Sequence, residues 1–231
     1  MGLLEGKVAI VTGAGGGLGR AHALLLAEHG ACVVVNDLGG ARDGTGSSNS
    51  MADSVVEEIR NAGGQAAATY GSVTEDDAAK AMVQCAVDNF GRLDILINNA
   101  GILRDRSFKN MTDAEWDAVI EVHLRGAYLV TKHSWQQMLT QGDGGRIIMT
   151  SSTSGLIGNF GQANYGAAKA GLAGFMRVLA LEGIKYGITV NVLAPAALSL
   201  LIGRRGIGGV GFGKDIGHRR EVDHARLELG V

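Results

Sequence analysis

The sequence predicts a doubly wound α/β fold, in which a single parallel sheet is covered by helices on both faces. Short runs rich in Val, Ile and Ala alternate with longer stretches in which apolar residues recur at helical spacing. The strand candidates are almost continuously apolar, which is typical of parallel strands buried on both sides. A chain of 231 residues can form this fold as a single domain.

The elements can be assigned along the chain from periodicity and end signals. Segments of small and β-branched residues predict strands at residues 7–13, 31–37, 65–71, 93–101, 145–152 and 187–195. Stretches with helical spacing predict helices at residues 17–30, 51–62, 74–91, 112–139 and 163–187. Thr74 is the expected N-cap of the third helix, because its hydroxyl can accept a hydrogen bond from a first-turn amide. We expect four helices to end at a glycine, because glycine readily adopts the left-handed conformation that often follows a helix. These glycines are Gly30, Gly63, Gly91 and Gly187.

Charge and cysteine content exclude several classes of function. The formal net charge of −2 argues against nucleic acid or an anionic membrane as a partner. Cys32 and Cys85 are too few for a disulfide framework or a metal site, so we expect buried, reduced thiols. The N-terminal apolar run is interrupted by Glu5 and Lys7, and we expect neither a signal peptide nor a membrane span. The sequence therefore predicts a soluble, cytoplasmic protein without a bound metal.

A glycine-rich segment, TGAGGGLG at residues 12–19, joins the first predicted strand to the first predicted helix. At such a junction Gly13 permits a tight turn, Gly17 lets the backbone approach a pyrophosphate, and Gly19 allows the helix to pack near the strand. The free amides and the positive dipole of the helix N-terminus attract phosphate. Glycine also marks ordinary turns, but its place between a strand and a helix favours a dinucleotide site.

Asp37 ends the second predicted strand, at about the ~20-residue separation where an acid accepts hydrogen bonds from both adenosine ribose hydroxyls. The carboxylate would repel the 2′-phosphate of NADP, so we expect NAD as the cofactor. The alternative is that Asp37 only forms the turn before Gly39 and Gly40.

Tyr165 and Lys169 share the segment YGAAK and, being four residues apart in a predicted helix, lie on one helix face. We expect the ammonium to lower the pKa of Tyr165 from its usual ~10, which would make it a general acid or base. Ser152 ends a predicted strand, at the sheet edge where ligands bind, and its hydroxyl can hydrogen-bond a carbonyl oxygen. For the pair alone, the alternative is a surface tyrosine packed over a lysine stem.

Four motifs, TGAGGGLG, NNAG, SS and YGAAK, resemble in order and spacing the signature of the short-chain dehydrogenase/reductase family. The resemblance covers about residues 4–195 and implies a Rossmann fold. It implies an NAD-dependent oxidoreductase acting on CH–OH groups, with Ser152, Tyr165 and Lys169 as catalytic residues. Tyr165 and Lys169 would also contact the cofactor, and residues 98–101 would line its adenosine side and brace the sheet. The implied cofactor contacts are Gly13, Gly17, Leu18, Gly19, Asp37, Ser72, Val73, Asn99, Ala100 and Gly101.

Within the family, the segments VVVNDLGG, NNAGILRDRSF and GNFGQANYGAAK resemble those of (3R)-3-hydroxyacyl-CoA dehydrogenases. This group occurs as a domain of peroxisomal multifunctional enzymes type 2 and as stand-alone bacterial proteins. The likeness implies oxidation of a 3-hydroxyacyl-CoA to a 3-ketoacyl-CoA in fatty acid metabolism, with an acyl-CoA as the small-molecule partner. Arg104 and Arg106 could meet a CoA phosphate, or pair with acids such as Asp105 or Asp113.

The residues alone, without the resemblance, support only hydride transfer to or from a secondary alcohol. An NAD(P)H-dependent reductase of 3-ketoacyl thioesters, steroids or sugar ketones is therefore an alternative. Two positions depart from the family pattern. His123 stands where many members have a proton-relaying asparagine, and a relay role through a bound water is its expected function. Ser72 stands where the family often places an aspartate near adenine.

The resemblance ends before the C-terminus. Residues 198–231 are rich in glycine and arginine and have neither helical nor strand periodicity. We therefore divide the chain into a dinucleotide-binding and catalytic domain at residues 1–197 and an atypical tail, which we interpret as a truncated or frame-altered ending. If that ending abolishes activity, the alternative function is a catalytically silent dinucleotide-binding protein. The resemblance also implies a homodimer or homotetramer packed through the helices at residues 112–139 and 163–186.

Overall fold

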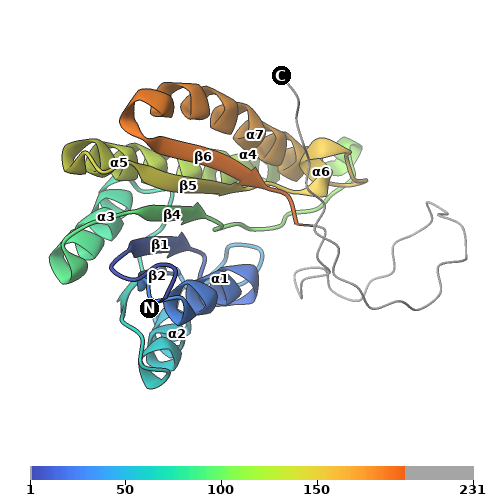
Figure 1. Cartoon of the computed structure of the whole chain (residues 1–231). Helices are drawn as coiled ribbons and strands as arrows, with labels where there is room; N and C mark the ends of the chain where they lie inside the picture. The colour runs from blue at the N-terminus through green and yellow to red at the C-terminus, as the bar shows by residue number, and fades with distance from the viewer. Residues whose placement is uncertain (1, 196–231) are drawn as a thin grey trace, which may run out of the picture. The chain divides into compact units, whose positions relative to one another are not determined.

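The computed structural model describes residues 2–195. These residues contain one sheet of six parallel strands, with helices packed on it (Figure 1). The strand order β3-β2-β1-β4-β5-β6 means that the chain starts at the centre of the sheet, builds one side and then returns to build the other. The strands are β1 (Val8–Thr12), β2 (Cys32–Asn36), β3 (Ala66–Thr69), β4 (Ile95–Asn98), β5 (Gly145–Thr150) and β6 (Ile188–Leu193). This topology confirms the predicted doubly wound α/β class, with the strand order of the Rossmann fold.

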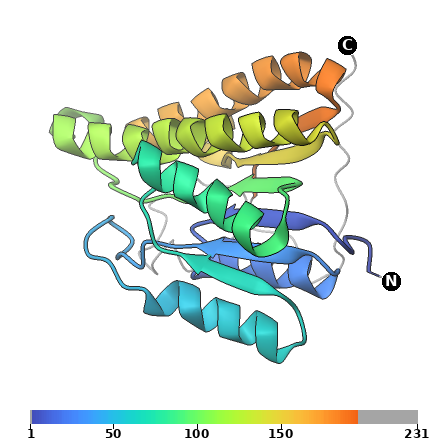
Figure 2. The ribbon, with the colours of Figure 1, turned by 90° about the vertical axis from the view of Figure 1, so that its left-hand side faces the viewer.

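The helices form one layer on each face of the sheet (Figures 1 and 2). One layer holds α1 (Gly17–Glu28) and α2 (Ser50–Asn61). The other holds α3 (Asp76–Phe90), α5 (Gly126–Gln141) and α7 (Ala163–Gly183). Shorter elements are η1 (Phe108–Asn110), α4 (Asp113–Ile120), η2 (Glu121–Arg125), α6 (Thr153–Leu156) and η3 (Ile184–Tyr186). Every predicted strand and helix within residues 2–195 is present, whereas the predicted tail and the domain boundary before it lie outside the described residues.

The core explains why the strands are continuously apolar. Alternate residues of β1 point into the two helical layers: Val8 and Ile10 pack on the side of α3, α5 and α7, and Ala9 and Val11 on the side of α1 and α2. All five residues of β1 are buried. A sheet covered on both faces has no solvated side, so neither set of alternate positions needs polar residues.

The helix predicted at residues 112–139 is divided by the π-helical turn η2. Its start is fixed by a capping box: Thr112 Oγ1 accepts from the Glu115 amide at 3.2 Å, and the Glu115 carboxylate accepts from the Thr112 amide at 2.9 Å. The wider turn at η2 contains His123, which is only 4% exposed. Such bulges occur often at functional sites. Periodicity does not reveal this one, because the helices on both sides keep their ordinary spacing.

Two smaller predictions are corrected. Thr74 is not the N-cap of α3, which begins at Asp76; instead the Thr74 amide donates to Ser72 Oγ at 3.2 Å, in a turn before the helix. Both cysteines are free, as expected, but they are half-buried instead of buried. The predicted helix-ending glycines all adopt positive φ: Gly30 (97°), Gly63 (87°), Gly91 (79°) and Gly187 (68°).

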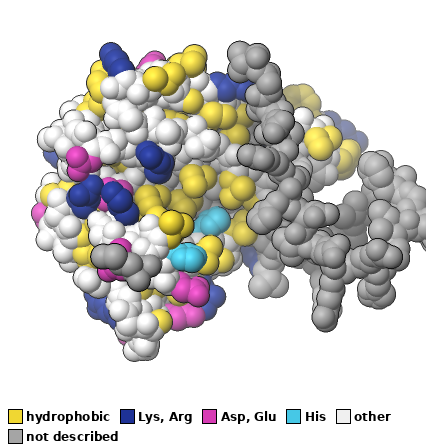
Figure 3. All heavy atoms as spheres, viewed as in Figure 1, with side chains coloured by type: hydrophobic (Ala, Val, Ile, Leu, Met, Phe, Trp, Pro, Cys, Tyr) yellow, Lys and Arg dark blue, Asp and Glu magenta, His cyan; other side chains and the backbone are white. Residues whose placement is uncertain are grey.

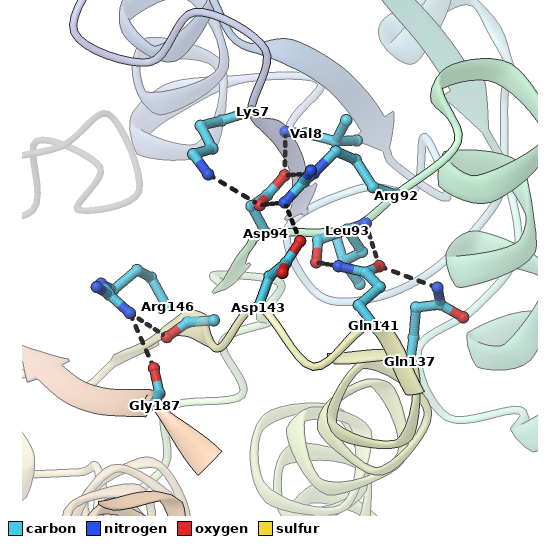
Figure 4. A network of polar contacts seen from close by, with 11 residues as sticks. Lys7, Val8, Arg92, Leu93, Asp94, Gln137, Gln141, Asp143, Arg146 and Gly187 are labelled. Carbon is cyan, nitrogen blue, oxygen red and sulfur yellow. Dashed lines mark hydrogen bonds and ion pairs between the residues drawn. The ribbon is translucent and has the colours of Figure 1, made fainter. Parts of the chain in front are cut away.

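A polar cluster fastens the amino-terminal ends of the central strands (Figure 4). The Asp94 carboxylate accepts hydrogen bonds from the Val8 amide at 2.9 Å and from Arg92 at 2.7 and 2.8 Å. Burial raises the pKa of Asp94, but the bonds from Arg92 and Val8 outweigh it and hold this pKa below its ordinary value of 3.8. Beside it, Gln141 donates to the Leu93 carbonyl at 2.9 Å and accepts from the Leu93 amide at 2.7 Å.

Within residues 2–195, no helix is long and apolar enough to cross a membrane. The same residues contain no group of three or more His, Cys, Asp or Glu side chains that could hold a metal ion.

Candidate active site

The glycine-rich turn lies at the carboxyl end of β1, where it leads into α1. Gly13 has a φ of +63°, and a Cβ added there would lie 2.7 Å from the Cα atom of Ala100. A side chain at Gly19 would collide with the carbonyl oxygen of Gly13. The tight turn and the close helix packing expected for these two glycines are therefore present.

The start of α1 is suited to a phosphate group. Gly16 is the N-cap, no side chain caps the helix, and its first turn holds no acidic residue. Gly17 has a φ of +53°, and the position that a Cβ would take has no other atom within 4 Å. Amides at an open helix N-terminus, together with the helix dipole, bind anions. These features fit the pyrophosphate of a dinucleotide, and Leu18 lies half-buried in the same turn.

The NNAG segment braces this turn from β4. Asn99 Nδ2 donates to the carbonyl oxygens of Thr12 and Gly13, each at 3.0 Å. Thr12 Oγ1 accepts in return from the amides of Asn99 at 3.0 Å and Ala100 at 3.1 Å. The bracing expected of this segment is therefore seen, while its contact with adenosine stays a prediction.

Asp37 follows β2 and faces the glycine-rich turn. Its Oδ2 accepts from the Gly15 amide and its Oδ1 from the Gly39 amide, both at 2.7 Å. The bond to Gly39 is the turn-forming contact of the alternative interpretation, and the bond to Gly15 joins the two loops. An ionised carboxylate has about four acceptor positions, so these two bonds leave capacity for ribose hydroxyls.

Ser72 and Val73 lie in the loop after β3. The Ser72 hydroxyl is 2.8 Å from that of Thr74. Val73 is 7% exposed and packs against Gly126, where a Cβ would lie 2.6 Å from Val73 Cγ2. Because the Val73 side chain belongs to the core, a cofactor contact at this position would have to come from its backbone.

Ser152, Tyr165 and Lys169 meet at the carboxyl end of β5. Ser152 follows β5 and caps α6, since its Oγ accepts from the Ser154 amide at 3.2 Å. Lys169 Nζ lies 5.5 Å from the centre of the Tyr165 ring, one turn back on α7. Ser152 lies close enough to the Tyr165 hydroxyl to lower the pKa of the phenol. The three residues are thus brought together, and their roles in catalysis stay predictions.

The expected lowering of the Tyr165 pKa is not found. Burial raises the pKa of Tyr165 above its ordinary 10.0, and the nearby Ser152 side chain offsets this only in part. Lys169 is 3% exposed, and its ammonium donates to the Thr150 carbonyl at 2.5 Å. Burial lowers the pKa of Lys169 to about 7, because a charge is poorly solvated in the interior. The prediction from spacing was therefore wrong for the protein alone, since it ignored the burial of both groups.

His123 is buried next to Tyr165. Its ring packs edge-on against the Tyr165 ring, with centres 5.1 Å apart, and lies against Gly101, where a Cβ would overlap it. Its Nε2 is 2.8 Å from the carbonyl oxygen and 3.0 Å from the amide nitrogen of Ile102. Burial lowers the pKa of His123 to about 3, so the imidazole is neutral at physiological pH.

A small cavity separates His123 from the sheet. The volume that the centre of a water molecule can occupy in it is about 10 Å³. The residues that line it include Thr12, Asn98, His123 and Lys169. That volume suits about one water. Among the described residues, His123 Nδ1 has no hydrogen-bond partner.

The side chains of Arg104 and Arg106 both form hydrogen bonds within the protein. Arg106 binds the Glu115 carboxylate through Nη2 at 2.8 Å and Nε at 3.1 Å. Arg104 Nε donates to the Asp43 carbonyl at 3.0 Å. The acidic partner is thus Glu115 and neither of the aspartates expected from the sequence. Because Glu115 neutralises Arg106, the argument for a CoA phosphate at this position loses its support.

The sequence analysis assigned no role to two buried polar residues of the site. Thr12, 1% exposed, braces the glycine-rich turn, and Asn164, completely buried, precedes Tyr165. The available signal for Asn164 was its place directly before the expected proton acceptor. The two acceptors of its amide nitrogen could not be found, because they come from segments at least 49 residues away.

Comparison with known proteins agrees with this geometry. The model of the family described as short chain dehydrogenase matches residues 7–200. The chain is 55% identical over 193 residues to peroxisomal multifunctional enzyme type 2 of Mus musculus, covering 84% of this chain and 26% of that protein. It is 45% identical over 201 residues to a hydroxyacyl-CoA dehydrogenase of Mycobacterium tuberculosis, covering 84% of this chain and 62% of that protein.

The solved structures include a similar protein. The crystal structure of a short chain dehydrogenase from Mycobacterium avium matches with a TM-score of 0.77 and 50% identity, over 84% of this chain and 68% of that chain. The chain spans about a quarter of the mouse enzyme and less than two thirds of the M. tuberculosis relative. The chain belongs to the short-chain dehydrogenase family, whose members are oxidoreductases that act on CH–OH groups with NAD or NADP.

Proposed function

We propose that the protein is an NAD-dependent dehydrogenase of secondary alcohols, with a (3R)-3-hydroxyacyl-CoA as substrate. The observation that carries the proposal is the meeting of Ser152, Tyr165 and Lys169 at the carboxyl end of β5. The glycine-rich turn lies at the same end of the parallel sheet, two strands away. One edge therefore offers both a proton acceptor and a dinucleotide site.

A bound nicotinamide would supply the hydride acceptor. In the oxidising direction Tyr165 takes the hydroxyl proton and Ser152 donates a hydrogen bond to the same oxygen. Ser152 Oγ already accepts from the Ser154 amide, which leaves its hydrogen for donation. Burial lowers the pKa of Lys169 to about 7, and the charged form of Lys169 favours the phenolate of Tyr165.

Charge next to the glycine-rich turn favours NAD over NADP. The Asp37 carboxylate is hydrogen-bonded to the Gly15 amide, so it is held against the turn. A 2′-phosphate at the expected ribose position would meet this like charge. Residues 15 and 16 are glycines, so these positions of the turn offer no cation that could offset the repulsion.

The substrate class is supported by the likeness to a hydroxyacyl-CoA dehydrogenase and by the apolar surface after Ser152. Leu156, Ile157 and Phe160 are 58%, 85% and 90% exposed. A ligand that covers apolar side chains is stabilised by about 25 cal/mol per Å² of apolar surface removed from water. This rim suits an acyl chain better than a sugar.

The role of His123 in a proton relay is restricted to binding a water molecule. A ring with a pKa of about 3 does not take up a proton at neutral pH, so it cannot pass protons as an imidazolium. A neutral ring can instead hydrogen-bond a water in the cavity that it shares with Lys169. His123 would then orient that water and not itself change charge.

The proposal includes self-association through α5 and α7. Tyr128 on α5 is 46% exposed, and Val178 and Leu181 on α7 are 53% and 72% exposed. Figure 3 shows hydrophobic side chains along the upper edge of the molecule, where α7 runs. A second copy of the chain would cover this surface, and light scattering of the purified protein at monomer mass would refute it.

The experiment that tests the function is a near-ultraviolet assay of NADH with NAD and a medium-chain (3R)-3-hydroxyacyl-CoA. We expect turnover with NAD, much less with NADP, and a loss of about 10²-fold to 10⁴-fold in Tyr165→Phe. NAD binding measured by calorimetry should be unchanged in this variant, because only a hydroxyl is removed. Full turnover by Tyr165→Phe would overturn the assignment of Tyr165, and equal rates with NADP would overturn that of Asp37.

A further inference from the structure

Asn164, directly before Tyr165, is a completely buried amide with hydrogen bonds at both ends. Its Nδ2 donates to the carbonyl oxygens of Arg104 at 3.1 Å and Glu115 at 3.0 Å. Its Oδ1 accepts from the Tyr165 amide at 2.7 Å. A buried amide costs free energy unless its polar atoms are paired, so this side chain is stable only while the three segments keep their positions.

The Arg104 carbonyl belongs to the segment between β4 and η1, which we call the strap and define as residues 101–106. On one side the strap is fastened to the loop after β2. The Leu103 amide donates to the Arg42 carbonyl at 3.0 Å, and Arg104 Nε donates to the Asp43 carbonyl at 3.0 Å. The strap is therefore tied to the loop that follows the expected adenosine contact.

On the other side the strap supports the residues around the phenol. Ile102 forms both contacts to His123, whose ring packs against Tyr165. The Arg106 amide donates to the Gly161 carbonyl at 2.8 Å, just before α7 begins. Asn164 adds the bond that joins the strap to the first turn of α7 itself.

The first turn of α7 needs such a support. The first amides of a helix have no partner within the helix, and a capping side chain usually satisfies one of them. The N-cap residue of α7, Gln162, makes no side-chain capping bond. Asn164 Oδ1 accepts from the first-turn amide of Tyr165 in its place, and its Nδ2 anchors that turn to two other segments.

We propose that Asn164 is a positioning residue, which sets the Tyr165 phenol relative to Ser152 and Lys169. This inference rests on the proposed function of Tyr165 as proton acceptor. Without the Asn164 bonds, the first turn of α7 can move relative to the strap and to β5. A displacement of about 1 Å at a reacting group can cost about a hundredfold in rate.

The test compares two neutral, near-isosteric substitutions in the full chain. Asn164→Leu removes the bonds to Arg104, Glu115 and Tyr165 without adding charge. Gln141→Met is the matched control, because Gln141 likewise joins backbone groups through its amide nitrogen and oxygen (Figure 4). Leu93, its partner, precedes β4, so the control lies at the end of the sheet away from Tyr165.

Two readouts separate positioning from folding alone. The first readout compares the change in kcat with the change in the dissociation constant for NAD. The second is the near-ultraviolet titration of the Tyr165 phenol. Its signal is isolated by subtracting the titration of a variant that carries Tyr165→Phe in the same background. We expect Asn164→Leu to lower kcat about tenfold to a hundredfold with NAD binding changed less than about twofold. We also expect the Tyr165 pKa to rise, because a displaced phenol loses part of the effect of Ser152, which lowers this pKa. Gln141→Met should lower stability and leave both readouts at wild-type values.

A phenol titration in Asn164→Leu that coincides with the wild-type curve would overturn the proposal, as would an unchanged kcat in folded protein. If Asn164→Leu does not fold, Asn164→Ser decides by the same criteria, because serine also loses the two long donor contacts. Absence of turnover in the wild-type protein would count against the proposed function only. The phenol titration needs no substrate, so it would still decide the role of Asn164.

Discussion

The glycine-rich turn offers a matched pair of substitutions, Gly13→Ala and Gly17→Ala. Both glycines have positive φ, of 63° and 53°, so alanine is strained at each. They differ in their surroundings. A Cβ at Gly13 would lie 2.7 Å from the backbone of Ala100, whereas a Cβ at Gly17 would meet nothing within 4 Å. The same change therefore tests packing at one position and cofactor approach at the other.

The expected magnitudes follow from these contacts. The left-handed conformation costs alanine about 1–2 kcal/mol at either position. At Gly13, forcing a methyl group against backbone adds about 1–3 kcal/mol, since Ala100 is held by Thr12 and cannot move alone. Gly13→Ala should thus lose about 2–5 kcal/mol of unfolding free energy, and Gly17→Ala only about 1–2 kcal/mol. By contrast, Gly17→Ala should weaken NAD binding about tenfold or more, because its methyl group occupies the expected approach of the pyrophosphate.

Urea denaturation at equilibrium measures the stabilities, and calorimetric titration with NAD measures the affinities. Gly63→Ala is a suitable control, because Gly63 also has positive φ and open space but lies after α2, away from the turn. If Gly13→Ala were as stable as Gly17→Ala, the close approach to Ala100 would not limit the turn. If Gly17→Ala bound NAD as tightly as Gly63→Ala does, the cofactor would not lie against Gly17.

Two further substitutions test charge. Asp37→Ser removes the like charge next to the expected ribose and should improve NADP relative to NAD about tenfold; this equals ~1.4 kcal/mol, between the ~1 kcal/mol of a charge contact in water and the ~4 kcal/mol of one near a protein surface. An unchanged ratio of kcat/KM values would refute this. Asp94→Asn should lower stability at neutral pH and reduce the loss of stability in acid. The sign follows from the lowered pKa of Asp94, whose ionised form stabilises the fold above the ordinary value of 3.8 and loses this effect as the pH falls through the folded pKa. Urea midpoints at neutral pH and near pH ~2, below the ordinary value, measure the effect, and an acid-induced loss in Asp94→Asn as large as in wild type would contradict it.

Prediction from the sequence succeeded where the signal is short in range. Strand positions, helix ends at glycine and the shared face of Tyr165 and Lys169 all depend on neighbours within a few residues. The tight conformation of the glycine-rich turn was equally predictable, because the turn joins a strand directly to a helix. The π-helical turn at His123 was not predictable, since one wider turn leaves the apolar periodicity on both sides unchanged.

Burial and partner choice were decided by the tertiary structure. Lys169 and Tyr165 sit where the sequence indicated, but the pKa of Tyr165 is raised instead of lowered, because the phenol is buried; burial also lowers the pKa of Lys169. Arg106 pairs with Glu115 instead of a neighbouring aspartate, since the capped start of α4 brings that carboxylate beside it.

The sequence by itself determined the doubly wound class, the glycine-rich turn and the identity of the three side chains Ser152, Tyr165 and Lys169 that meet. The tertiary structure decided that Asn164 joins the strap, α4 and α7, through partners 49 and 60 residues away in the chain. The physical reason is that periodicity reports only local geometry. Hydrogen bonds of a buried amide depend on which distant backbone groups the sheet order brings within about 3 Å.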